Sequence, residues 1–419
     1  MLGLILAGEA IYALPFHLTR FFRPTILEVF DLTATELGAA QSVYGIVAML
    51  AYFPGGPLAD RFPARKLMAM SLWTTAAGGL YLATFPDHTG TTLVFAFFGV
   101  TTILLFWAAL IKAARDWGDE DTQGRAYGIL DGGRGLLAAA MASIGVMVFG
   151  WAFPDGYEAA TDAQRTEALR TVIYGYTSVT AFAGVFVWFA LKDHGDSPTQ
   201  LNDTRAALSN VPVVLRKPTV WLQACIVACA YAGFKGIDNY SLYAVQVYGL
   251  DPVRAGEIVA WGSWTRAIAA LAAGFLGDRF SRPGMLLWLF VGLLISNLFF
   301  ATYTPGEAAV VVLTSNVILA SILVFALRGL YFSIFEDADV PTRATGTAVG
   351  VVSVTGYTPD IFMYLVAGIL IDTYPGITGH QYYFYVLASF ALLGAVASAL
   401  FARVAREPPR KSSSEPARE

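Results

Sequence analysis

Long apolar runs alternate with short polar segments along the whole chain of 419 residues. Each run is close to the ~20 residues that an α-helix needs to cross the hydrocarbon core of a bilayer. Because apolar residues are continuous within a run, the pattern favours helices over a β-barrel. It predicts an all-α integral membrane protein with twelve transmembrane helices. These lie at residues 2–28, 37–59, 66–85, 91–114, 126–150, 171–191, 218–246, 255–277, 284–303, 308–334, 344–371 and 381–403.

Several runs contain residues that disfavour a regular helix. Pro54-Gly55-Gly56 predicts a break in the second span, and Pro359 predicts a kink in the eleventh. In the seventh span, Gly236 and Asn239 favour a local break that would line a cavity.

Composition excludes several classes of protein. The chain is 56% hydrophobic and only 14% charged, with a mean hydropathy of +0.57. Soluble domains carry roughly 25% charged residues, so an ordinary soluble enzyme and a disordered protein are both excluded. The net charge of −4 and the lack of a long basic tract argue against a nucleic-acid partner.

Basic residues are distributed unevenly between the two sets of loops. Most lie on the side that holds both termini, while the opposite side holds only Arg165, Arg170 and Arg254, with Arg23 near the end of the first span. The positive-inside rule therefore predicts that both termini are cytoplasmic in a multi-pass protein of the inner or plasma membrane.

The chain contains an internal repeat with an offset of 218 residues. Residues 56–62 and 274–280 share the pattern G-x-L-x-D-R-F at the ends of the second and eighth spans. The loops before the fifth and eleventh spans match at the same offset. We therefore predict two pseudo-symmetric six-helix halves at 1–191 and 218–403, a cytoplasmic linker at 192–217 and a disordered tail at 404–419.

The repeated D-R-F element resembles the signature between the second and third spans of the major facilitator superfamily. The resemblance covers nearly the whole chain, although Pro63-Ala64-Arg65-Lys66 keeps only the basic pair of the motif's continuation. It implies secondary transport by alternating access. It also implies a cytoplasmic gate in which each aspartate faces the start of a helix in the other half. The residues assigned to this gate are Asp60, Arg61, Asp278, Arg279, Arg125 and Arg343.

Ionisable residues inside spans are costly and point to function. Lys235 and Asp238 lie three apart in the seventh span, and the offset of 218 relates Lys235 to His17 in the first. We assign substrate binding to His17, Arg20, Lys235, Asp238 and Arg134. We assign ion coupling or charge pairing to four further residues, Asp131, Arg266, Arg328 and Asp360. The last three lie on separate helices and are candidates for a second polar cluster.

Two segments resemble the organophosphate:phosphate antiporter branch of the superfamily. They are Lys235-Gly236-Ile237-Asp238 in the seventh span and the segment 344–350 at the start of the eleventh. That branch binds an anion with symmetric arginines, which here correspond to His17 and Lys235. Since lysine cannot form a two-point fork on phosphate, a carboxylate or another anion is equally compatible.

The sequence thus predicts a secondary transporter for a small organic anion or acidic metabolite, with a proton or counter-anion as the coupling solute. Alternatives are a proton-coupled exporter of drugs or neutral sugars, a transport-dead membrane sensor and a membrane-embedded enzyme. The fifth span lacks the Gly-Pro element of drug exporters, which disfavours that alternative. We expect a monomer without a metal or cofactor. Aromatic residues that could line a cavity are Trp107, Trp261, Trp264, Tyr44, Tyr231, Tyr240 and Tyr357.

Overall fold

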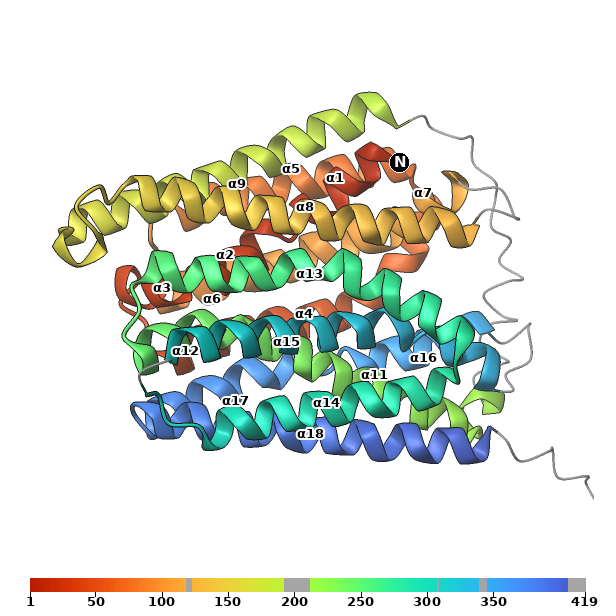
Figure 1. Ribbon diagram of the computed structural model, residues 1–419. Coiled ribbons are helices and arrows are strands. Elements are labelled where there is room, and N and C mark those ends of the chain that lie inside the picture. The colour runs from red at the N-terminus through yellow and green to blue at the C-terminus, as the bar shows by residue number, and fades with distance from the viewer. Residues whose placement is uncertain (118–122, 192–211, 307–308, 339–344, 406–419) are drawn as a thin grey trace, which may run out of the picture.

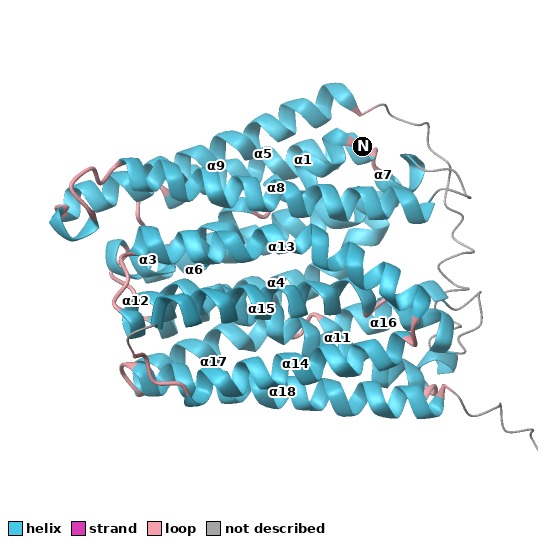
Figure 2. Cartoon of the chain, viewed as in Figure 1, coloured by secondary structure: helices cyan, strands magenta, loops and turns pink. Residues whose placement is uncertain are grey.

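A computed structural model describes residues 1–117, 123–191, 212–306, 309–338 and 345–405 of the chain (Figure 1). In these ranges every regular element is a helix (Figure 2). The prediction of an all-α membrane protein is therefore confirmed. Residues 192–211 of the predicted linker (192–217) and residues 406–419 of the predicted tail (404–419) lie outside the described residues.

The helices fall into two sets along the chain. The first set is α1 (Leu2–Ala10), η1 (Ala13–His17), α2 (Leu18–Phe21), α3 (Arg23–Val29), α4 (Ala34–Arg61), α5 (Ala64–Leu82), α6 (His88–Gly99), η2 (Val100–Trp107), α7 (Ala108–Trp117), α8 (Gln123–Trp151), η3 (Tyr157–Ala159) and α9 (Asp162–Ala190). The second set is α11 (Pro218–Gly236), η4 (Ile237–Asn239), α12 (Tyr240–Tyr248), α13 (Pro252–Arg279), α14 (Arg282–Thr302), α15 (Ala309–Leu330), η5 (Ser333–Ala338), α16 (Thr345–Gly356), α17 (Pro359–Thr373) and α18 (Ile377–Val404).

Most of the predicted spans are helices long and apolar enough to cross a membrane. Ten described helices meet this condition, and the pair Leu2–Ala10 and Ala13–Phe21, bent by 43°, makes eleven. The less apolar helix α5 occupies the place of the third predicted span and packs against α9 and η2.

The predicted breaks are correct in two spans and wrong in one. The seventh span changes at Gly236 into the 3-10 turn η4, and the eleventh is interrupted before Pro359. The second span, in contrast, runs through Pro54 and Pro57 as one helix, α4. A π-helix, η1, in the first span was not predicted; it contains Pro15, which lacks the amide hydrogen that a regular turn needs.

Local sequence signals define the helix ends at one end of the bundle. Thr33 and Glu36 form a capping box at the start of α4, and Thr161 and Gln164 form another at the start of α9. Asp251 accepts hydrogen bonds from two amides at the start of α13. Because α9 begins at Asp162, the segment between the predicted fifth and sixth spans is shorter than the span boundaries implied.

The two sets of helices meet closely at the end of the bundle opposite the start of α1 and the end of α18, where α4 packs along α17 (Figure 1). Gly38 faces the carbonyl group of Tyr364, and Gly368 faces that of Ala34. A Cβ atom at either glycine would collide with the backbone of the other helix. Small residues at a helix interface permit such a close approach. We call this contact the α4–α17 seam.

An aspartate extends the α4–α17 seam. The Asp372 carboxylate accepts hydrogen bonds from the amides of Ala34 and Thr35, at 3.3 and 2.6 Å. A negative charge at a helix N-terminus is stabilised by the helix dipole and by the free amide groups there. The contact thus joins the end of α17 to the start of α4.

Candidate functional site

A cavity of about 120 Å³ lies between the two halves, and its wall comes from both. Its ionisable wall residues are Glu9, His17, Arg20, Arg134, Lys235, Arg266, Arg328 and Asp360. Seven of the nine predicted binding and coupling residues are in this set. The other two, Asp238 and Asp131, pair with arginines of the wall, so the structure brings all nine into one cluster and not two.

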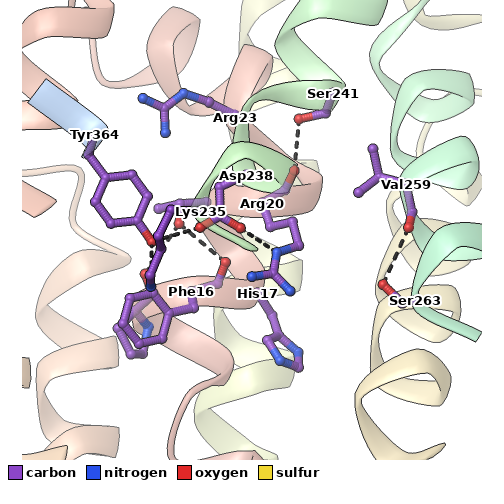
Figure 3. Close-up of polar contacts among 12 residues, drawn as sticks. Phe16, His17, Arg20, Arg23, Lys235, Asp238, Ser241, Val259, Ser263 and Tyr364 are labelled. Atoms are coloured by element: carbon purple, nitrogen blue, oxygen red, sulfur yellow. Dashed lines mark hydrogen bonds and ion pairs between the residues drawn. The ribbon is translucent and has the colours of Figure 1, made fainter. Parts of the chain in front are cut away.

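Asp238 joins the two halves at the centre of the site. It forms an ion pair with Arg20, and its second oxygen accepts a hydrogen bond from the Tyr364 hydroxyl at 2.7 Å (Figure 3). Positions 20 and 238 are 218 residues apart, so they are equivalent positions of the internal repeat. Both carboxylate oxygens are therefore occupied, and Asp238 is fully buried behind the cavity wall.

Lys235 pairs with a carboxylate from another helix and not with Asp238. Its Nζ lies 2.6 Å from the Asp360 carboxylate and also donates to the Tyr364 hydroxyl at 2.9 Å. The Tyr231 hydroxyl donates to the other Asp360 oxygen at 2.8 Å. The break before Pro359 places Asp360 in the first turn of α17, facing this cluster.

The cations of the two halves also pack on each other's aromatic rings. The Lys235 ammonium lies 4.1 Å from the centre of the Phe16 ring, and the Arg20 guanidinium lies 4.7 Å from that of Phe234. Phe16 and Phe234 are equivalent in the repeat, as are His17 and Lys235. Cation–π contacts of this kind are attractive where water is excluded.

Glu9 is the main functional candidate that the sequence did not assign. It lies near the chain start, yet it is only 2% exposed and faces three basic residues from three elements. Its carboxylate lies 3.0 Å from His17 Nε2, 3.3 Å from Arg134 Nε and 3.6 Å from Arg266 Nη1. The signal available in the sequence was an acidic residue in the middle of the first apolar run.

The remaining arginine pairs link α8 to both halves. Arg134 Nε donates to the Gly8 carbonyl oxygen at 3.0 Å, beside its contact with Glu9. Arg266 Nη2 lies 3.2 Å from the Asp131 carboxylate, which joins α13 to α8. These two arginines hold the first span, α8 and α13 together around one acidic residue.

Arg328 differs from the other cations of the cavity. Its guanidinium carbon lies 3.9 Å from the centre of the Phe234 ring, but no carboxylate of the described residues forms an ion pair with it. Its Nη1 atom is buried without a hydrogen-bond partner. Arg328 therefore presents to the cavity a positive charge that no ion pair among the described residues occupies.

The structure also corrects the placement of two basic residues. Arg23 was counted with the loops, but it is 0% exposed and donates from Nη1 to Gln41 Oε1 at 2.9 Å. His380 directly precedes the predicted twelfth span, but it is buried in α18 with Nε2 at 2.8 Å from Gln246 Oε1. Both lie outside the cavity wall.

The aromatic residues predicted as possible cavity lining fall into two groups, those that line the cavity and those that lie elsewhere. Tyr44, Trp107, Tyr231 and Tyr357 line the cavity, while Tyr240 is buried elsewhere. Trp261 and Trp264 face outward and are 41% and 44% exposed. The wall also contains aromatic residues that were not predicted. These are Tyr12, Phe16, Tyr52 and Phe234.

The predicted gate is only partly covered by the described residues. Asp60 and Arg61 end α4, and Arg279 ends α13; all three are exposed. The described part of the structure does not include Arg343 or the side chains of Asp278 and Arg125. The predicted contacts of the gate therefore lie outside the described residues.

The geometry agrees with a match to known proteins. Residues 5–361 match the model of the Major Facilitator Superfamily. The chain belongs to the major facilitator superfamily. As a member of this superfamily it is a secondary transporter and not an enzyme, which confirms the resemblance that the D-R-F repeat suggested.

Two relatives from Escherichia coli (strain K12) resemble this superfamily member over most of their length. Inner membrane protein YihN is 28% identical over 406 residues, which cover 96% of this chain and 94% of the relative. Inner membrane protein YqcE is 27% identical over 373 residues, with 87% and 85% covered.

Two solved structures share the fold of the major facilitator superfamily seen here. The nucleoside transporter NupG gives a TM-score of 0.72 at 15% identity and covers 96% of this chain and 99% of its own. A bacterial homologue of the human lysosomal transporter Spinster gives 0.70 at 17% identity, with 97% and 98% covered. At these identities the likeness concerns the fold.

Proposed function

We propose that this protein carries a small organic anion across the inner membrane by alternating access. The observation that supports this substrate class is Arg328, which lines the cavity between the halves and forms no ion pair with a carboxylate of the described residues. A buried charge without a partner is unfavourable, and a bound anion would remove that penalty.

The other cations of the wall have a second role in the proposal. Arg134 and Arg266 face Glu9, and Lys235 faces Asp360, so in this state internal carboxylates occupy the positions of an anionic ligand. A substrate that binds these cations would displace the carboxylates. Exchange of partners of this kind couples ligand binding to movement of the helices that supply them.

The proposal also covers the membrane in which the protein lies and the side on which its termini lie. The two relatives are named inner membrane proteins, and the excess of basic residues on the side of the termini favours cytoplasmic termini. The α4–α17 seam then closes the outer end of the site. The state described here is accordingly one in which the substrate does not enter from outside.

Solute flux in proteoliposomes tests the proposal. The panel contains organic acids, sugar phosphates, neutral sugars and lipophilic cations, each tested for uptake against the same solute inside. We expect flux of an anion only, and about a tenfold or greater loss in Arg266→Gln, since a hydrogen bond to a charged group contributes about 1.5–3 kcal/mol. Arg254→Gln is the control, because Arg254 lies on the same helix and pairs with Glu257 outside the cavity.

Two results would contradict the proposal. Flux of cations or neutral solutes alone, equal in both variants, would remove the anion assignment and favour the exporter alternative. Absence of flux for every class, with folded protein present in the vesicles, would favour a sensor.

A further inference from the structure

A buried arginine lies outside the cavity and beyond the central ion pair. Arg23 is 0% exposed, and Figure 3 shows it on the side of Asp238 that faces away from His17. It belongs to α3 of the first half, yet the groups that interact with it electrostatically include Asp238, Tyr383 and Asp372 of the second half. Arg23 therefore lies at the interface of the two halves, near the α4–α17 seam.

The Arg23 guanidinium has one occupied end and one edge without a partner. Its Nη1 atom donates to Gln41 Oε1 at 2.9 Å. Its Nε and Nη2 atoms are buried and form no hydrogen bond. These two nitrogens make up the edge with which a guanidinium donates two parallel hydrogen bonds to a carboxylate or a phosphate. Gln41 thus fixes Arg23 in a position where its two-point edge is unused.

The two carboxylates that act on Arg23 are engaged with other groups. One oxygen of Asp238 pairs with Arg20, and the other accepts from the Tyr364 hydroxyl. Asp372 accepts two amide hydrogen bonds at the start of α4. Neither carboxylate therefore occupies the two-point edge of Arg23.

Two further polar side chains near Arg23 are buried without hydrogen bonds of ordinary geometry. Asn239 in η4 is 2% exposed and Tyr383 in α18 is 1% exposed, and both atoms of the Asn239 amide and the Tyr383 hydroxyl lack partners. Tyr383 lies close to both Arg23 and Asn239. We call these three residues the outer polar cluster. Buried polar atoms are normally satisfied, and most of those in this cluster are donors, which an anion matches.

We propose that the outer polar cluster is a second binding site for the transported anion, whose carboxylate or phosphoryl group accepts two parallel hydrogen bonds from Arg23. This inference rests on the proposed function and extends it beyond the central ion pair. The seam covers the cluster in this state, because Gln41 lies between Gly38 and Gly45, where added Cβ atoms would collide with the backbone of α17. An anion reaches Arg23 when α4 and α17 separate, and its binding favours that open state.

Chemical modification of arginine tests the site in the full chain. Phenylglyoxal reacts with free guanidinium groups, and mass spectrometry gives the rate at each arginine. The reaction is run on proteoliposomes in inorganic phosphate, in lactate as a carboxylate, or in chloride at equal ionic strength. At saturation we expect phosphate or lactate to slow the modification of Arg23 about tenfold or more relative to chloride, because charge-assisted hydrogen bonds occupy the reacting nitrogens.

Arg254 is the internal control, because it lies at the same end of the bundle and pairs with Glu257. Its rate should be the same in all three solutions. The anion that protects Arg23 shows whether the site takes a phosphoryl group or a carboxylate. The same reaction is run on Gly368→Val, in which the added side chain separates α17 from α4.

The outcomes separate this inference from the proposed function. Equal rates at Arg23 in the three solutions overturn the outer site and leave anion transport standing, since water then satisfies the cluster. An Arg23 that stays unreactive even in Gly368→Val also overturns it, because no anion then reaches the residue. Protection of Arg23 without flux of any anion keeps the binding site and contradicts the proposed function.

A substitution separates anion binding from support of the fold. Arg23→Lys keeps the charge and a donor for Gln41 but cannot form the two-point fork. We expect its unfolding temperature to stay near that of the wild type. In right-side-out vesicles, half-maximal uptake of the organic acids or sugar phosphates that the wild type carries should require about tenfold more solute. Arg254→Lys is the matched control and should leave uptake unchanged.

Two results for Arg23→Lys would count against the outer site. Uptake that reaches half its maximum at the wild-type concentration would show that the fork is not used. A fall in the unfolding temperature that accounts for the loss of uptake would assign Arg23 to the support of the fold.

Discussion

The ion pair between Arg20 and Asp238 connects equivalent positions of the two halves, and this gives a test at the level of single residues. Either Arg20→Gln or Asp238→Asn leaves one buried charge without its partner, which costs about 3–5 kcal/mol of stability. Exchange of the two residues, Arg20→Asp with Asp238→Arg, restores the pair in the reverse direction. We expect the exchanged protein to recover most of the unfolding temperature that each single variant loses.

The control for this exchange is the pair Arg254 and Glu257, which is partly exposed at the start of α13. Exchange there should change the unfolding temperature little, because surface ion pairs contribute ~1 kcal/mol or less. Equal unfolding temperatures for the two single variants and the wild type would show that the central pair does not stabilise the fold.

The sequence identified the charged residues of the site but not their partners. A charge inside an apolar run is visible in one dimension, so Lys235, Asp238 and Asp360 could all be predicted. Their spacing brings Lys235 and Asp238 near each other on one helix, yet each pairs with a residue of a different helix. Partner choice depends on helix packing and on the break at η4, which a single sequence does not specify.

At the level of helices, the α4–α17 seam depends on glycine, and this predicts a change in conformation. Gly368→Val would place side-chain atoms against the Ala34 carbonyl group, so α17 must separate from α4. We expect Leu242→Cys, whose native leucine is 2% exposed and packs with Ala34, to react faster with a membrane-impermeant maleimide in this variant. The measurement uses a background in which Cys225 and Cys229 are replaced by alanine.

Gly175→Val is the control for this prediction, because no atom lies within 4 Å of a Cβ added at Gly175. It should leave the labelling rate unchanged. Equal labelling rates in the Gly368 and Gly175 variants would mean that the seam tolerates the added atoms without opening.

Helix breaks show where the prediction of the fold succeeded and where it failed. Glycine at 236 and proline at 359 mark real interruptions, but Pro54 and Pro57 lie inside a continuous helix. A proline removes one backbone hydrogen bond, and within a membrane protein neighbouring helices can supply compensating contacts. Here Gly55 lets η2 pack closely on α4: a Cβ atom added at Gly55 would lie 3.4 Å from the Ile103 carbonyl oxygen. This packing involves another helix and cannot be seen in the local sequence.

For the whole molecule, the start of α1 and the end of α18 lie at the same end of the bundle (Figure 1). The excess of basic residues on that side predicts that this end faces the cytoplasm. A fluorescent reporter that matures only in the cytoplasm should therefore be bright when fused to either terminus. A reporter inserted after Asp155, an exposed position at the opposite end, should stay dark. Bright fluorescence at Asp155 and none at the termini would reverse the orientation.

The contact between positions 20 and 238 also bears on how such a molecule can arise. In a dimer of two identical six-helix chains, a residue on the twofold axis faces its own copy. Arginine would then oppose arginine, or aspartate would oppose aspartate, and two like charges would be buried together. The attractive pair seen here requires halves that differ in sequence. Divergence of the two halves thus made available an interaction that perfect symmetry forbids.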